Sequence, residues 1–160
     1  MTILGQGKNR YLVTGEEWGD LPSGWIYRDA TAVAVDSKDN VVVFNRGGHS
    51  IIIFDKTGGF VRSFGEGIFS NPHGVAVGPE DEIYCVDAGD HTLRKFTSDG
   101  TLLLTIGVPG KPSSWMGGAP FNAPTHVSID FRDGSIYVSD GYKNAHVHKF
   151  SPDGKLMFSW

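Results

Sequence analysis

The sequence predicts an all-β fold made of four-stranded propeller blades, and three observations support this prediction. Its apolar runs are short, rich in Val, Ile, Phe and Tyr, and separated by turn clusters that draw on 22 glycines and 8 prolines. No stretch sustains the 3.6-residue apolar period of an amphipathic helix. A four-strand pattern recurs three times at offsets of 42 and 52 residues, which is the period of propeller blades.

The repeats align once an insertion at 107–120 is allowed for, and that insertion accounts for the longer second offset. Each repeat begins with a Val-Ala-Val-type strand and a polar turn. A second strand, a third strand ending in Phe, a turn with Gly and a fourth strand follow. The aligned segments are residues 33–58, 75–100 and 127–154.

We expect the aligned apolar residues to be buried between blades, because neighbouring blades pack face to face. The third-strand residues Phe54, Phe96 and Phe150 should be fully buried. Val33 and Val35 of the first strand should be buried in part. Four-stranded blades are expected at about 30–65, 72–107 and 123–160, with residues 1–29 as an N-terminal segment and a candidate edge strand or cap.

Composition and charge exclude several classes of function. The net charge is −4 with no basic run, which argues against a nucleic-acid surface. No apolar stretch is long enough to span a membrane, and the first 13 residues lack the apolar core of a signal peptide, so we expect a soluble chain of unassigned compartment. The single cysteine, Cys85, lies in an apolar strand pattern and is interpreted as a buried hydrophobe rather than a nucleophile.

The repeats resemble NHL repeats, and more narrowly those of the peptidyl-α-hydroxyglycine α-amidating lyases and their bacterial relatives. The resemblance rests on "NPHGVAVG" at 71–78, "IYCVDAGDHTLRKFTSDG" at 83–100 and "IYVSDGYKNAHVHKFSPDGK" at 136–155. It covers about 30–160, and "WGDLPSGW" at 18–25 is similar as well. It implies a six-bladed propeller, of which this chain carries three blades, or half.

The resemblance also implies a chemistry. Enzymes of that branch hold a zinc ion with three histidines on alternating blades, beside an arginine and a tyrosine, and bind a calcium ion in the tunnel. They split a peptidyl-α-hydroxyglycine into a peptide amide and glyoxylate. The resemblance implies that His73 in Pro-His-Gly is one of the three zinc ligands, and that Arg46 and Tyr142 are catalytic residues.

Antiparallel connectivity places these residues at one end of the blades. The loop entering the first strand and the loop joining the second and third strands emerge there together. Thr125 and His126 come from the first kind of loop, and His91 comes from the second, so we expect these three residues to contact substrate. His126 falls one position after the ligand slot, which Thr125 occupies, and it is therefore not counted as a zinc ligand.

Each candidate also has a structural interpretation that the sequence leaves open. His73 can be a hydrogen-bonded turn histidine, Arg46 a surface ion-pair partner and Tyr142 an aromatic ring packed on its own turn. A further polar residue stands at the same position in each repeat, at the end of the second strand, and we interpret this position, termed the polar slot, as structural. It recurs in all three blades as Asn45, Asp87 and Asp140, whose side chains we expect to accept backbone N–H bonds in the loop joining the second and third strands.

Two classes of function therefore remain. A catalytic zinc site needs three protein ligands and an open position, and only one zinc histidine is matched. The chain is either part of a zinc lyase, inactive alone, or a non-catalytic module that binds a peptide or small molecule; whether it is an enzyme stays open. Three blades also expose two apolar flanks, so we expect a homodimer that closes a six-bladed ring.

Overall fold

The computed structural model describes residues 2–13, 15 and 18–160. These residues form fourteen β-strands and no helix, so no helix among them is long and apolar enough to cross a membrane. The all-β fold class is confirmed.

Twelve of the strands form three antiparallel sheets of four strands each, in which strands adjacent in sequence are paired. Blade 1 contains β3 (Ala30–Val35), β4 (Val41–Asn45), β5 (Ile51–Phe54) and β6 (Phe60–Phe64). Blade 2 contains β7 (Pro72–Val77), β8 (Ile83–Asp87), β9 (Thr92–Phe96) and β10 (Leu102–Ile106). Blade 3 contains β11 (His126–Ile129), β12 (Ile136–Asp140), β13 (His146–Phe150) and β14 (Leu156–Ser159).

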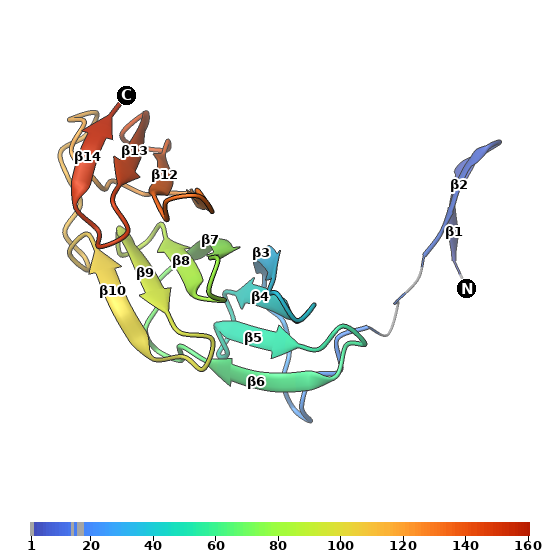
Figure 1. Ribbon diagram of the computed structural model, residues 1–160. Helices are drawn as coiled ribbons and strands as arrows, with labels where there is room; N and C mark the ends of the chain where they lie inside the picture. The colour runs from blue at the N-terminus through green and yellow to red at the C-terminus, as the bar shows by residue number, and fades with distance from the viewer. Residues whose placement is uncertain (1, 14, 16–17) are drawn as a thin grey trace.

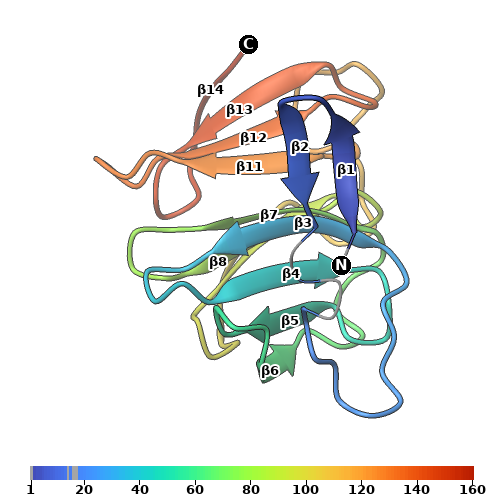
Figure 2. The ribbon, with the colours of Figure 1, turned by 90° about the vertical axis from the view of Figure 1, so that its right-hand side faces the viewer.

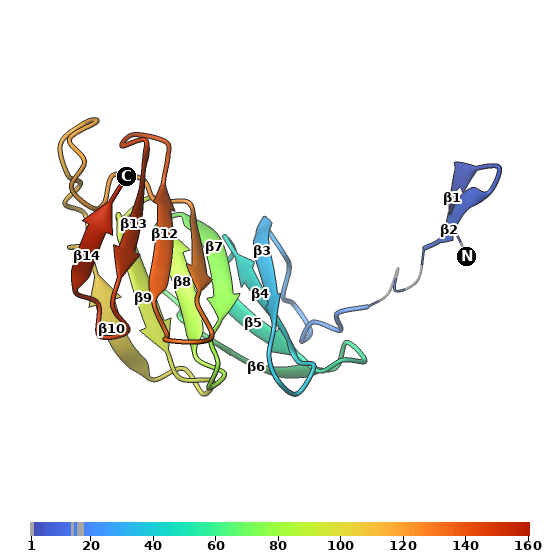
Figure 3. The ribbon, with the colours of Figure 1, turned by 45° about the horizontal axis from the view of Figure 1, so that its top comes forward.

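The three blades stand face to face along an arc, as Figures 1 and 3 show. The first strands β3, β7 and β11 lie on the concave side of the arc, and the last strands β6, β10 and β14 lie on the convex side. This is the arrangement of blades in part of a propeller.

The two remaining strands, β1 (Ile3–Gln6) and β2 (Asn9–Leu12), form a hairpin. They pair with each other and with no other strand in the described ranges. The hairpin projects away from the blades in Figure 1, and Figure 2, viewed from that side, shows it in front of them. Its apolar side chains, such as Tyr11 at 69% exposure, are not packed against the blades.

Two apolar clusters hold neighbouring blades together. Phe96 and Cys85 of blade 2 pack against blade 1, and Phe150 of blade 3 packs against blade 2. All three side chains are at most 1% exposed, which confirms the expected burial of the two phenylalanines. Gly100, with φ of 96°, makes the close approach to the preceding blade possible, because a Cβ there would lie 2.7 Å from Cγ of Phe64.

The expected burial of the first strand of blade 1 is wrong. Val33 and Val35 are 63% and 55% exposed. Their counterparts in blades 2 and 3 face a preceding blade, whereas Val33 and Val35 face the side of blade 1 on which the described chain places none. Phe54 is fully buried, but against Trp18 and Leu21 rather than between two blades.

Candidate functional site

The polar slot at the end of each second strand fixes the loop that enters the first strand. The Asp87 carboxylate accepts hydrogen bonds from the backbone N–H groups of Asn71 and Gly89, both at 2.8 Å. Asp140 and Asn45 accept equivalent bonds from the backbone N–H groups of Asn122, at 2.9 Å, and Arg28, at 3.1 Å. The three slot side chains belong to residues of zero exposure. The predicted structural role is confirmed, but its expected place is wrong for two of the three residues: only Asp87 also accepts from the loop between the second and third strands, at Gly89, whereas Asn45 and Asp140 accept from the loop that enters the first strand.

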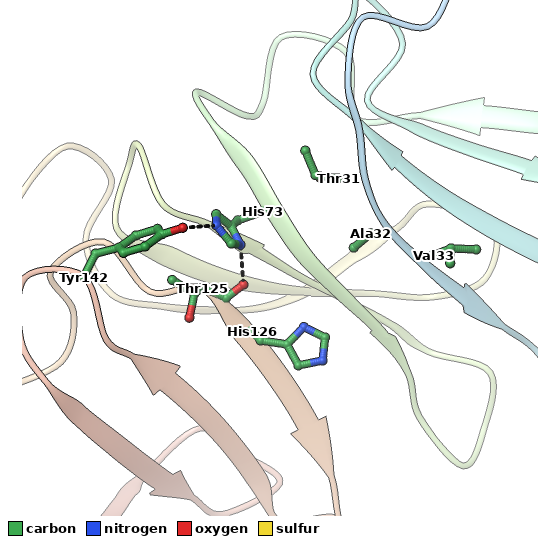
Figure 4. Close-up of a pocket in the computed structure, with 7 residues that line it drawn as sticks. All are labelled: Thr31, Ala32, Val33, His73, Thr125, His126 and Tyr142. Atoms are coloured by element: carbon green, nitrogen blue, oxygen red, sulfur yellow. Dashed lines mark hydrogen bonds between the residues drawn. The ribbon is translucent and has the colours of Figure 1, made fainter.

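Four of the predicted site residues line one open cavity of about 530 Å³ on the concave side of the blades: His73, Thr125, His126 and Tyr142 (Figure 4). His73 lies on β7, and Tyr142 lies in the loop between β12 and β13. The remaining wall comes from blade 1, through Thr31, Ala32 and Val33.

His73 has a fixed orientation in this cavity. Its Nδ1 lies 2.7 Å from the carbonyl oxygen of Thr125. A carbonyl only accepts hydrogen bonds, so Nδ1 carries the proton and donates it. In the neutral ring Nε2 is then an acceptor, and it lies 3.2 Å from the phenolic oxygen of Tyr142, which donates. Anchoring one ring nitrogen on a backbone carbonyl is how proteins orient a histidine whose other nitrogen binds a metal or a proton.

The glycine after His73 has a packing reason. A Cβ on Gly74 would lie 2.6 Å from the Thr125 carbonyl oxygen and 2.9 Å from Nδ1 of His126. Only glycine therefore lets blades 2 and 3 come close enough for His73 to reach the Thr125 carbonyl. The Pro-His-Gly stretch at the start of β7 combines an oriented imidazole with a close contact between blades.

The other cavity residues differ in what they offer a ligand. Tyr142 is 65% exposed, and His126 is exposed as well. The hydroxyl of Thr125 lies 2.8 Å from that of Ser139, so this side chain is bonded within its own blade. Tyr142 and His126 are thus the more accessible polar groups.

Arg46 and His91 do not line the cavity. The Nε of Arg46 donates to the carbonyl oxygen of Pro72, the residue before His73, at 3.1 Å. His91 Nδ1 accepts from the backbone N–H of Ala123 at 3.0 Å, so this side chain connects blade 2 to the loop entering blade 3. Arg46 is next to the site, while His91 supports the loop behind it. Their roles toward a substrate stay predictions.

The structure also places two polar residues, Thr31 and His148, in roles that the sequence did not predict. Thr31 lines the cavity from the position 42 residues before His73, so the repeat offset alone could have found it. His148 is fully buried, with Nε2 3.2 Å from the Asp140 carboxylate and Nδ1 2.7 Å from the Ser159 hydroxyl. The pattern of residues within one strand could not predict this hydrogen-bond network, because its members lie on three strands, β12, β13 and β14.

The residues present do not form a complete zinc site. His73 presents one oriented nitrogen, but no three His, Cys, Asp or Glu side chains of the described ranges are placed to hold one ion. Three protein ligands are the usual requirement for catalytic zinc.

Comparison with known proteins supports the repeat assignment. The model of the NHL repeat family matches residues 69–96. The chain is 28% identical to peptidylglycine alpha-amidating monooxygenase of Rattus norvegicus over 91% of its length. It is 31% identical to peptidyl-alpha-hydroxyglycine alpha-amidating lyase 1 of Drosophila melanogaster over 81% of its length. The solved structure of a streptogramin B lyase superposes with a TM-score of 0.61 over 80% of the chain, at 21% identity.

The chain spans only part of each of these proteins: 18% of the rat protein, 28% of the fly lyase and 39% of the solved lyase. The structural likeness establishes the propeller fold, and the sequence likeness relates the blades to the amidating lyases. The chain is built of propeller-type blades, carries an NHL repeat at residues 69–96, and is homologous at low identity to the peptidyl-α-hydroxyglycine α-amidating lyases.

Proposed function

We propose that this chain forms one side of a lyase-type site for a peptidyl-α-hydroxyglycine, and that it lacks efficient lyase activity by itself. The observation that supports this proposal is the orientation of His73, whose Nδ1 is bonded to the Thr125 carbonyl and whose Nε2 faces the Tyr142 hydroxyl. An oriented pair of this kind is suited to accept and return a proton at a bound substrate.

The reaction needs such a pair. When a peptidyl-α-hydroxyglycine is split, the hydroxyl loses its proton, the bond between carbon and the amide nitrogen breaks, and the nitrogen gains a proton. Tyr142 would first give up its own proton to become a phenolate, and would then take the hydroxyl proton of the substrate and return it to the nitrogen of the leaving amide. Arg46, held on Pro72, would hold the carboxylate of the substrate through a guanidinium fork.

The missing parts of the site are metal ligands. In a complete enzyme zinc would replace the Tyr142 hydroxyl at Nε2 of His73, so the bond between these two side chains would open, and the other two zinc ligands would come from residues outside these three blades. A calcium ion in the tunnel remains a proposal drawn from the family resemblance. With one matched histidine, the isolated chain should not release glyoxylate efficiently.

The cavity also supports a second function, a non-catalytic module that binds a peptide or small molecule. Its walls are an open mixture of apolar groups and hydrogen-bonding groups, with no metal-ligand triple in the described ranges. Such a site can hold a ligand without transforming it.

One experiment separates these functions. The purified chain is mixed with an N-acylated peptidyl-α-hydroxyglycine in the presence of zinc, and both glyoxylate release and binding are measured. We expect binding that is weakened in Tyr142→Phe and lost in His73→Ala, with no zinc-dependent release above that of His73→Ala. Robust release by the isolated chain would refute the predicted inactivity. Equal binding of the matching peptide amide would favour the non-catalytic module.

A further inference from the structure

The interface between blades 1 and 2 and the interface between blades 2 and 3 share one packing pattern in their outer part. The last strand of one blade covers the phenylalanine and the turn glycine of the next. Between blades 1 and 2, Phe64 lies with its ring centroid 5.5 Å from that of Phe96, at 55° between the ring planes. It also lies against Gly100. Arg62, two residues earlier on β6, donates to the carbonyl oxygen of Ser98 at 3.1 Å.

The segment before blade 1 shows the same packing pattern on the outer flank of that blade. Trp18 lies 5.4 Å from Phe54 between ring centroids, at 53°, and a Cβ on Gly58 would lie 3.0 Å from Trp18 Cδ1. The indole N–H of Trp18 donates to the carbonyl oxygen of Lys56 at 3.4 Å. Phe54, Lys56 and Gly58 each lie 42 residues before Phe96, Ser98 and Gly100.

Residues 18–22, which we term the cap, therefore occupy the place of the last strand of a preceding blade. The backbone N–H of Asp20 fixes the cap by donating to the Gly58 carbonyl at 2.9 Å, and Leu21 packs on the buried cluster of Val43, Ile52 and Phe54. The cap covers the outer half of this flank and leaves the β3 side chains Val33 and Val35 exposed.

The opposite flank, on blade 3, carries the matching half of the contact, and no blade among the described residues covers it. Phe158 and Trp160 stand at the repeat positions of Arg62 and Phe64 and are 53% and 56% exposed. They pack on each other at 5.2 Å between ring centroids, and Trp160 packs on Tyr137 at 6.4 Å. At the internal interfaces, the residues in these positions cover the following blade.

We propose that blade 3 of a second copy docks on the outer flank of blade 1, and that the cap competes with its β14 for the same place. Docking requires the cap to leave Phe54 and Gly58, after which the partner's Trp160 takes the place of Trp18. Strands β11 and β12 of the incoming blade cover Val33 and Val35, as β3 and β4 cover Val75. Because the operation is two-fold, the same contact forms twice and closes the ring.

The occupant is a second copy because the blade 3 flank continues the register of both internal interfaces, and the blade 1 flank presents the Phe and Gly that this register covers. Competition with the cap makes association weaker than the apolar area alone would give, since docking must first break the Trp18 and Asp20 contacts. The proposal does not depend on lyase activity.

The test compares self-association by sedimentation velocity over a concentration series. The cap-release variant Trp18→Ala with Leu21→Ser should dimerise at least tenfold more tightly than the wild type. Adding Phe158→Ser and Trp160→Ala to this variant should return it to a monomer. Tyr11→Ala, a change in the exposed hairpin, is the matched control and should leave association unchanged.

A milder variant guards against misfolding of the cap-release protein. Asp20→Pro removes the N–H donated to Gly58 and leaves the Trp18 ring in the sequence, so it should strengthen association in the same direction. Unchanged association in both cap variants would overturn the proposal. Association that persists after Phe158 and Trp160 are replaced would overturn it as well, because it would not use the blade 3 flank.

Discussion

Two sets of polar residues lie near the same end of the blades and differ in how they repeat. Asp87 is fully buried, and its counterparts Asn45 and Asp140 bind backbone N–H groups in the same way. His73 is unique, because threonines, Thr31 and Thr125, stand at its position in the neighbouring blades. Residues that recur in every blade build the blade, and residues that differ between blades are where a site can develop.

The largest effect should come from a repeated apolar residue. Phe96 is fully buried between blades 1 and 2. Phe96→Ala should lower the free energy of unfolding by about 3–5 kcal/mol, because it removes a large side chain and leaves a cavity. Urea denaturation measures this change. Phe131→Ala, at a residue with 65% exposure, is the control and should stay within about 0.5 kcal/mol.

A repeated polar residue should matter almost as much. Asp87→Ala leaves the N–H groups of Ser70, Asn71 and Gly89 without their acceptor. Each unsatisfied buried group costs about 1–3 kcal/mol, so we expect a loss of about 2–4 kcal/mol after partial hydration. Asp87→Asn retains one acceptor oxygen and should lose less. Equal losses in the two variants would contradict this account.

The reactivity of Cys85 measures how often blade 2 opens, because this residue lies on β8 two residues before Asp87. Burial raises the pKa of its thiol, so the thiolate that reacts with alkylating agents forms only when blade 2 opens. Labelling by iodoacetamide should therefore be slow in the wild type. Asp87→Ala should speed it by about tenfold or more, since 1.4 kcal/mol corresponds to a factor of ten. Rapid labelling of the native chain would show that β8 is more accessible than its burial indicates.

His73→Ala should have a small effect on stability and a large one on binding. The half-buried ring loses one bond to the Thr125 carbonyl and one to Tyr142. The expected cost is about 1 kcal/mol in urea denaturation, so Cys85 labelling should speed by no more than about fivefold. A loss above about 2 kcal/mol would place His73 in the scaffold, with the repeated residues.

The same distinction explains what the sequence could predict. The turn glycines, the slot at Asp87 and the strand order follow from three aligned repeats, so they were accessible. Burial of Val33 was predicted wrongly, since a repeat pattern does not show whether a neighbouring blade is present. The bond from His73 to Thr125 depends on the spacing between blades, and no pattern within one repeat encodes it. His148 was missed for the related reason that its partners lie on two other strands.

The smallest effect should come from a polar residue that builds a turn but stays exposed. The side chain of Thr97 and the backbone N–H of Thr101 hydrogen-bond the Asp99 carboxylate and lower its pKa. A lowered folded-state pKa stabilises the protein above the unfolded value, near 3.9, and this contribution is lost as the pH falls through the folded pKa. Asp99→Asn keeps an acceptor in the turn but does not titrate. Its melting temperature should therefore fall slightly less than that of the wild type between about pH 5 and pH 2.5, measured by calorimetry. Because the carboxylate is exposed to solvent, the difference should be smaller than for any buried residue above, and identical pH profiles would mean that the turn bonds persist after protonation.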